Sequence, residues 1–307
     1  MKFFAFRFFV YLWLESTTKI MKHTILTSLL ISLLVLASCS DNSQQKVEPP
    51  TRQGWDSELP ILKGDVESIT ITQYAIRRAS GKIVKFAEES KYLYRFNQRG
   101  DVVERVEYDN NNMPSHRCLY TYDSENRMVE AAWYKNDTLM TWKALYAYDD
   151  KGRMIEEAGY NSDGSKLDFT LYTYDAMGRK TEAACYSGEG VLQLVSFLQY
   201  DENGLLKEDA RYYGDGKLGY KYAYNYNESN CLVEIEEYDY EGPVSATKYI
   251  RNDEDRILAE ESYDARGTLE DRKAYIYDTK GNVVTVLPTD DFTEPYGFMT
   301  EYDISYR

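Results

Sequence analysis

Residues 146–179 read YAYDDKGRMIEEAGYNSDGSKLDFTLYTYDAMGR, which is one repeat unit and the start of the next. The pattern Y-x-Y-D-x-x-G-R stands at Tyr146–Arg153 and returns at Tyr172–Arg179, 26 residues later. Between the copies lies a second turn signal, Asp163-Gly164, flanked by segments in which apolar and polar residues alternate. Alternation is typical of half-buried strands, and Asp-Gly between such segments is typical of a hairpin turn. Each unit is therefore predicted as strand, turn, strand, turn.

The same spacing runs through most of the chain. We call the residue that closes each Y-x-Y-D pattern the anchor; it recurs every 26 residues and then twice at intervals of 25. A fixed period of this length indicates a repeat architecture, in which each unit buries its apolar face against its neighbours. The anchors are Asn97, Asp123, Asp149, Asp175, Asp201, Asn227, Asp253, Asp278 and Asp303.

The fold is predicted to be all-β, with tandem antiparallel β-hairpin repeats forming one long meander sheet of about sixteen to eighteen strands. Strand twist accumulates over so many strands, so we expect the sheet to be strongly twisted and to curl. The sequence does not decide whether it closes on itself. Residues 66–96 supply a starting hairpin that turns at Ala79-Ser80-Gly81, and residues 294–307 a final strand.

The turn chemistry of the repeat is specific. Asp at the first and Gly at the fourth position of D-x-x-G predict a type I turn, in which the carboxylate accepts backbone N–H groups and Gly takes a positive φ. A glutamate also recurs seven residues after the anchor, and we expect this solvated row to pair with Arg127, Arg153 and Arg179. Repetition argues against a catalytic role, because an active site needs one asymmetric constellation. The row is Glu104, Glu130, Glu156, Glu182, Glu208 and Glu234.

The N-terminus indicates export. From Met21 the chain reads MKHTILTSLLISLLVLASC, with Lys22 before an apolar core that is too short for a membrane span. The end of this segment, Leu36-Ala37-Ser38-Cys39, resembles the lipobox of bacterial lipoproteins, which implies that Cys39 is lipidated. Ser40 after the cysteine resembles an outer-membrane address. We therefore expect an outer-membrane lipoprotein of the cell envelope, on the periplasmic face or at the cell surface.

These signals divide the chain into four parts. Residues 1–20 precede a complete signal and are interpreted as a mis-called extension, and residues 21–38 are the signal peptide. Residues 39–60 hold the lipidated cysteine and a polar, flexible tether. Residues 61–307 form the repeat domain.

Composition limits the partners. The 307 residues carry 51 acidic and 36 basic side chains, a net charge of −15, without a basic cluster. Such a surface repels nucleic acid, so we expect no nucleic-acid partner. Tyrosine is unusually abundant, with 30 residues against 11 Phe and 4 Trp. Tyrosine suits half-buried strand positions, where its ring packs and its hydroxyl meets water.

The Y-x-Y-D-x-x-G-R pattern, as in Tyr146–Arg153, resembles the YD repeat of RHS proteins. The resemblance covers residues 66–303 in weak form and 94–284 clearly. It implies long β-sheets that curl into shells around a toxin or other cargo. This chain departs from that family in its short length, its longer and more regular unit, and the lack of an RHS core signature. It is also similar to small repeat lipoproteins of Bacteroidota.

No catalytic residue, metal site or cofactor is predicted. His116 stands in a turn region without a recognisable nucleophile motif, and the cysteines show no C-x-x-C spacing for zinc. The tyrosine rows are expected to be the core of the sheet, or else an aromatic platform for a ligand. The ligand-facing candidates are Tyr134, Tyr146, Tyr148, Tyr160, Tyr172, Tyr174, Trp133 and Trp142.

These features favour a non-enzymatic cell-envelope lipoprotein that acts as a binding or scaffold module. Its expected partners are the membrane, through the lipid on Cys39, and a glycan or an envelope protein. Two alternatives remain open: a glycan-binding surface lipoprotein that uses its Tyr and Trp rows, and an RHS-like shell fragment related to toxin delivery.

Overall fold

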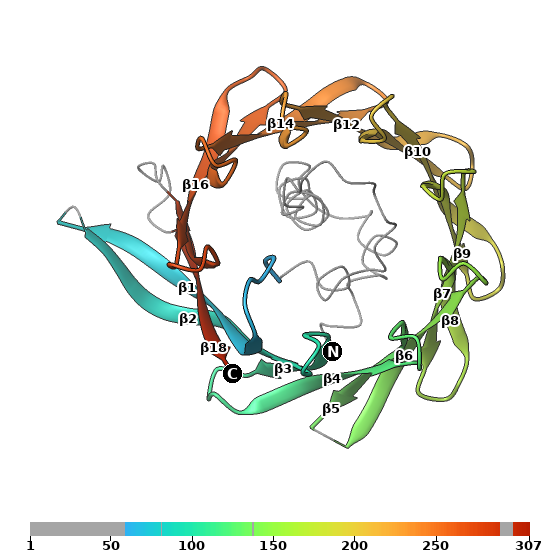
Figure 1. Cartoon of the computed structure of the whole chain (residues 1–307), viewed down its shortest axis with the longest axis horizontal. Coiled ribbons are helices and arrows are strands. Elements are labelled where there is room, and N and C mark those ends of the chain that lie inside the picture. The colour runs from blue at the N-terminus through green and yellow to red at the C-terminus, as the bar shows by residue number, and fades with distance from the viewer. Residues whose placement is uncertain (1–58, 81, 137, 289–296) are drawn as a thin grey trace, which may run out of the picture.

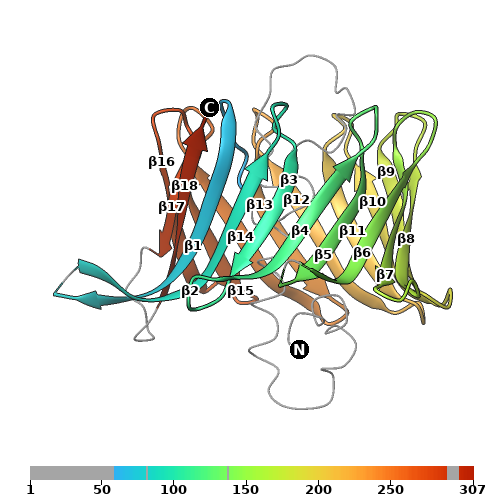
Figure 2. The same ribbon diagram turned by 90° about the horizontal axis from the view of Figure 1, so that it is seen from below.

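The computed structural model describes residues 59–80, 82–136, 138–288 and 297–307. These residues form eighteen strands in one antiparallel sheet, in which each strand pairs with the next along the chain. Figure 1 shows the strands arranged in a ring, and Figure 2 shows them tilted against its axis. The strands are β1 (Val66–Ala79), β2 (Lys82–Phe96), β3 (Val102–Tyr108), β4 (Pro114–Tyr122), β5 (Met128–Lys135), β6 (Leu139–Tyr148), β7 (Met154–Asn161), β8 (Lys166–Tyr174), β9 (Lys180–Ser187), β10 (Leu192–Tyr200), β11 (Leu206–Tyr213), β12 (Leu218–Tyr226), β13 (Leu232–Asp239), β14 (Gly242–Arg251), β15 (Ile257–Asp264), β16 (Leu269–Tyr277), β17 (Val283–Pro288) and β18 (Gly297–Tyr306).

The sheet closes into a barrel because its first and last strands pair. β1 lies antiparallel to β18 from Val66 opposite Tyr306 to Ile76 opposite Gly297. The all-β hairpin repeats are thus confirmed, but the sheet is a closed barrel rather than the long, curling meander sheet that was expected. Pairing β1 with β18 satisfies backbone groups that two free edges would leave exposed, and this favours closure once twist has brought the ends together.

Turns lie at both of the predicted places in the unit. At Asp149 the carboxylate Oδ1 accepts the backbone N–H groups of Lys151 and Arg153, both at 2.9 Å, and Gly152 has a φ of 77°. The hairpin turn at Gly164 also has a positive φ, of 84°. The anchor turns lie at the rim that carries the C-terminus, called here the anchor rim (Figure 2).

Two anchor positions differ from the prediction. In the seventh unit the turn is closed by Asn252, not Asp253: the side-chain oxygen of Asn252 accepts the N–H of Glu254 at 3.0 Å and of Arg256 at 2.9 Å. The short turn before β14 removes one residue from this unit, so the 25-residue interval falls one unit earlier than expected. Asp303 lies inside β18 rather than in a turn.

The register divides the side chains into an inner and an outer wall. Residues 59–65 lie inside the ring in Figure 1, and buried Leu59 packs in one cluster with Ile69, Ile71 and Tyr94. These side chains therefore face the lumen, and the alternation of each strand carries the assignment around the barrel. The inner wall holds most of the tyrosines of the Y-x-Y pattern, and the outer wall holds the repeated glutamates.

The starting hairpin is confirmed and extends beyond the barrel. β1 and β2 pair as far as Ala79 opposite Lys82, whereas β2 pairs with β3 only from Tyr92 onward. The hairpin tip therefore projects sideways from the rim opposite the anchor rim (Figure 2).

Candidate functional site: the inner and outer walls

A repeated tyrosine bond holds the inner wall at the anchor rim. At six of the anchors, the hydroxyl of the preceding tyrosine donates to a backbone carbonyl twenty residues earlier, which ties the open ends of one hairpin together. These bonds are Tyr122 to Val102, 2.7 Å; Tyr148 to Met128, 2.7 Å; Tyr174 to Met154, 2.6 Å; Tyr200 to Lys180, 2.7 Å; Tyr226 to Leu206, 2.8 Å; and Tyr277 to Ile257, 2.7 Å. Arg251 replaces tyrosine in the seventh unit and donates to the carbonyl of Leu232 at 3.0 Å.

The repeated arginine completes this arrangement. Arg127 binds the Asp123 carboxylate at 2.7 Å, and its guanidinium lies 5.0 Å from the ring centroid of Tyr148. Arg153 and Arg179 repeat these contacts one and two units later. The expected pairing of these arginines with the glutamate row is therefore wrong. Each arginine thus pairs with the aspartate of its own turn and lies over the tyrosine ring of the next unit, because the turn directs the arginine side chain toward that ring.

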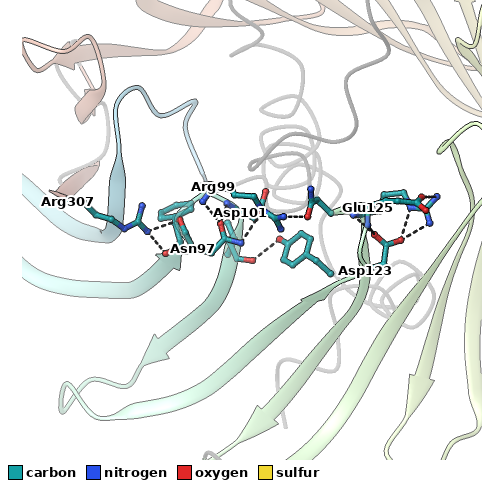
Figure 3. Close-up of polar contacts among 11 residues, drawn as sticks. Asn97, Arg99, Asp101, Asp123, Glu125 and Arg307 are labelled. Carbon is teal, nitrogen blue, oxygen red and sulfur yellow. Dashed lines mark hydrogen bonds and ion pairs between the residues drawn. The ribbon is translucent and has the colours of Figure 1, made fainter.

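Neighbouring turns also contact each other along the anchor rim (Figure 3). Arg99 binds Asp101 of its own turn at 3.1 Å and also contacts Asn126 of the next turn. Arg307 at the chain end donates to the carbonyls of Phe96, at 2.6 Å, and Asn97, at 2.7 Å. The residue that follows β18 is thus held on the turn that follows β2.

These contacts shift the pKa values of the groups involved. Burial, followed by the charge of Asp123, raises the pKa of Tyr148 to about 12. The backbone N–H of Arg153 and then its side chain lower the pKa of Asp149. Both shifts favour the protonation states that the hydrogen bonds need, a neutral phenol and a charged carboxylate.

The predicted ligand-facing residues do not share one surface. Tyr146, Tyr148, Tyr172, Tyr174, Trp133 and Trp142 face the lumen, whereas Tyr134 and Tyr160 face outward. The hydroxyls of Tyr148 and Tyr174 bind backbone carbonyls, and Tyr172 donates to Glu157 at 3.1 Å. Trp133 and Trp142 stack on each other with ring centroids 3.7 Å apart. The predicted lipidation site, Cys39, lies outside the described residues.

On the inner wall of β11 to β16, charged side chains also form hydrogen bonds and ion pairs with other side chains of the same wall. Asp209 binds Arg211 at 2.7 Å, and Glu237, which is 2% exposed, accepts from Ser245 at 2.9 Å. Glu260 accepts from Tyr275 at 3.0 Å and pairs with Lys273 at 3.3 Å. Each of these charged side chains has a hydrogen-bonding or ionic partner, as burial of charge requires.

The outer wall carries the glutamate row in ion pairs with lysines and arginines of the adjoining strand. Glu104 pairs with Arg117, Glu130 with Lys143 at 3.1 Å, Glu156 with Lys166 at 2.9 Å, Glu208 with Lys221 at 3.7 Å and Glu234 with Lys248 at 3.3 Å. Glu182 makes no such pair within the described part of the chain. The middle of the outer wall is thus charged around most of the ring.

The basic residues of the outer wall follow a pattern that the sequence analysis did not single out. Six residues before the anchor, on the outer wall, most units carry a basic residue: Lys91, Arg117, Lys143, Lys221 and Arg272. Two consecutive units carry the larger apolar residues Phe169 and Val195 at this position, and the seventh unit, counted from Asn252, carries Ala246. Aligning the units on their anchors would have revealed this break from the sequence.

Other signs of chemistry are few. His116 on β4 lies opposite Glu107, with its Nδ1 3.8 Å from the Glu107 carboxylate. Over the described ranges, no group of three or more His, Cys, Asp and Glu side chains could hold a metal ion. In the same ranges no helix is long and apolar enough to cross a membrane.

Comparison with known proteins does not identify a family for this chain. It matches no protein-family model and no curated protein. A porin-like protein from Bacteroides uniformis ATCC 8492 is 10% identical with a TM-score of 0.43, over 78% of this chain and 98% of that one. A porin-like protein from Bacteroides vulgatus ATCC 8482 is 11% identical with a TM-score of 0.36, over 79% and 99%. A TcdB2-TccC3 toxin chain is 9% identical with a TM-score of 0.30, over 70% of this chain and 15% of that one. Similarity at this level does not bear on what the chain binds.

The fold and its walls define the class of this protein as an eighteen-stranded antiparallel barrel built from hairpin repeats. Its particular features are an aromatic, hydrogen-bonded lumen wall and a charged outer wall.

Proposed function

We propose that this chain is a non-enzymatic, envelope-anchored binding or scaffold protein whose barrel stands in water beside the membrane rather than across it. The observation that carries the proposal is the charge on the outer wall at mid-strand. The ion pairs Glu130–Lys143, Glu208–Lys221 and Glu234–Lys248 would face acyl chains in a membrane-spanning barrel. One lysine or arginine on the lipid face at the bilayer midplane costs about 2–4 kcal/mol.

The inner wall supports the same conclusion. Barrels that conduct water and solutes have polar lumens and apolar outer bands. Here the buried cluster of Tyr222, Tyr224, Ile235, Tyr249 and Ile257 faces inward. The inner wall of these strands thus carries a buried aromatic and apolar cluster beside its paired charges, and the outer wall is charged, which suits a barrel whose core lies on its inner surface.

The lipid on Cys39 would then be the only attachment to the membrane, through the segment before the barrel. The test compares the full chain with its Cys39→Ala variant in a bacterial host with lipoprotein processing. We expect the unaltered protein in the membrane fraction and the variant in the soluble fraction, monodisperse without detergent. A variant that still needs detergent for extraction would show that the barrel itself inserts into the bilayer.

Glycan binding is a second candidate, supported by one observation. Trp133 and Trp142 form a half-exposed aromatic stack on the inner wall, where a sugar ring could pack. Titration of soluble oligosaccharides against tryptophan fluorescence tests this, with Trp142→Ala as the variant that should lose the response. The tyrosine rows contribute less to this candidate, because several of their hydroxyls are bonded within the wall.

A further inference from the structure

The outer wall of β8 to β10 breaks the repeat in a way that creates a distinct surface. Phe169 and Val195 stand where most other units carry a basic residue, and Leu171 and Phe197 lie two residues further along the same strands. Leu171 is 39% exposed and Phe197 44% exposed. In Figure 1 this part of the ring lies opposite the projecting β1–β2 hairpin.

These side chains are contiguous across three strands. Phe169 on β8 lies opposite Tyr186 on β9, and their rings stack with centroids 5.0 Å apart. Ala184 on β9 pairs with Leu171 on β8 and with Val195 on β10. Lys166 bounds the surface, with its ammonium 4.5 Å from the ring centroid of Phe169. We call Phe169, Leu171, Tyr186, Val195 and Phe197 the outer apolar patch.

The patch borders the carboxylate of Glu182, which in the described part of the chain lacks the ion pair that other glutamates of its row make. Lys143 lies opposite Ala132 and pairs with Glu130, and Lys221 lies opposite Ala210 and pairs with Glu208. Val195 takes the same position opposite Ala184, two residues from Glu182. Because valine has no charge, Glu182 is the member of its row without an ion pair among the described residues. Its strand neighbours are Thr173 and Phe197.

We propose that the outer apolar patch binds a protein segment that presents apolar side chains around one lysine or arginine, whose cation pairs with Glu182. This deepens the proposed binding role and rests on it. Exposed aromatic and aliphatic side chains supply the area of such a contact, and a complementary charge supplies its specificity. Of the two residues that replace a basic side chain here, Val195 is the one at the position from which a cation would compete for Glu182.

Other occupants fit the surface less well. A sugar needs hydrogen-bonding groups at its ring edges, and Leu171 and Val195 offer none. A lipid surface would desolvate the Glu182 carboxylate without a compensating charge. A second copy in a two-fold contact would bring two Glu182 carboxylates toward each other.

The test uses the substitution Val195→Lys, which restores the arrangement of neighbouring units and should leave the fold intact. A library of random short peptides is selected on the full-length protein, and the enriched peptides are measured against three forms of it. We expect enriched peptides with a Lys or Arg among apolar residues, and an affinity about ten-fold weaker for the variant. Ala246→Lys is the matched control, because it adds the same charge on the outer wall of β14, and it should bind like the unaltered protein.

Three results would overturn the proposal. Enriched peptides without a basic residue would remove the role of Glu182, and peptides that bind the Val195→Lys variant equally well would place their site elsewhere. A dimer that Val195→Lys dissociates, measured by sedimentation, would make a second copy the occupant. If instead the proposed function is wrong and the barrel inserts into the membrane, extraction of the Cys39→Ala variant will require detergent. That result does not depend on peptide binding, so the two failures are distinguishable.

Discussion

The hydroxyl of Tyr148 donates a 2.7 Å hydrogen bond to the carbonyl oxygen of Met128, twenty residues earlier in the chain. The bond joins the end of β6 to the start of β5, the two strands of one hairpin, at the rim where the hairpin is open. Equivalent bonds recur in most units, and each of those hairpins is closed by a turn at one end and by a tyrosine hydroxyl at the other.

Tyr148→Phe should lower the free energy of unfolding by about 1–2 kcal/mol, because the Met128 carbonyl loses its donor in a half-buried position. Denaturant unfolding followed by circular dichroism measures this loss. The control is Tyr212→Phe on the outer wall, whose ring packs edge-on against Phe197 and whose hydroxyl makes no hydrogen bond within the described chain. An equal loss in both variants would contradict a specific role for the Tyr148 bond.

The barrel should lose stability in acid through its turn aspartates. The backbone N–H of Thr268 and then the side chain of Arg266 lower the pKa of Asp264 to about 2, and backbone donors similarly lower the pKa of Asp149 and Asp175. A carboxyl whose pKa is lower in the folded state stabilises the fold above its ordinary pKa, and this stabilisation is lost as pH falls toward 2. The denaturant concentration at the unfolding midpoint should therefore decrease as the pH is lowered from 5 to 2, and it should decrease less in the Asp149→Asn variant. A midpoint that is constant over this range would refute the linkage.

Tyrosines of the inner wall should ionise late and destabilise the barrel when they do. Burial raises the pKa of Tyr148, Tyr220 and Tyr226 to about 12. A raised pKa means that the neutral phenol is favoured by folding, so its stabilisation is complete below the ordinary value and is lost as pH rises toward 12. Absorbance of tyrosinate at alkaline pH should show a late phase that coincides with unfolding. Complete titration of all tyrosines in the folded barrel at their ordinary pKa would exclude this burial.

Asn282→Ala should weaken the seam of the barrel, which is the pairing of β1 with β18. Asn282 is fully buried, accepts the N–H of Lys63 at 2.5 Å, and donates to the carbonyl of Lys63 at 3.0 Å and to the hydroxyl of Tyr306 at 2.7 Å. Its removal should cost about 1–3 kcal/mol, because buried backbone groups lose their partners. Hydrogen exchange should accelerate in β1 and β18 before it does in β8 and β9. Uniform acceleration would show that the seam does not open separately.

The sequence predicted much of this fold and less of its candidate sites. Some features depend only on residues close in sequence, so the spacing of those residues was sufficient to predict them. They are the turn at Asp149, the hairpin over residues 66–96 and the shared strand face of Tyr146 and Tyr148. The partners of the glutamates were not predictable in this way, because Lys143 reaches Glu130 only through the register of two strands. The same holds for the outer apolar patch, whose side chains become neighbours when β8, β9 and β10 pair.

The sequence by itself determined the repeat unit, its two turns and the alternation of side chains along each strand. These follow from local physical chemistry, namely the turn preferences of Asp and Gly and the two-residue period of a strand. Only the tertiary structure decided that β1 meets β18 and that the tyrosines of the Y-x-Y pattern face the lumen. Closure depends on the twist summed over all strands and on contacts between the two ends of the sheet, and no local pattern contains either quantity.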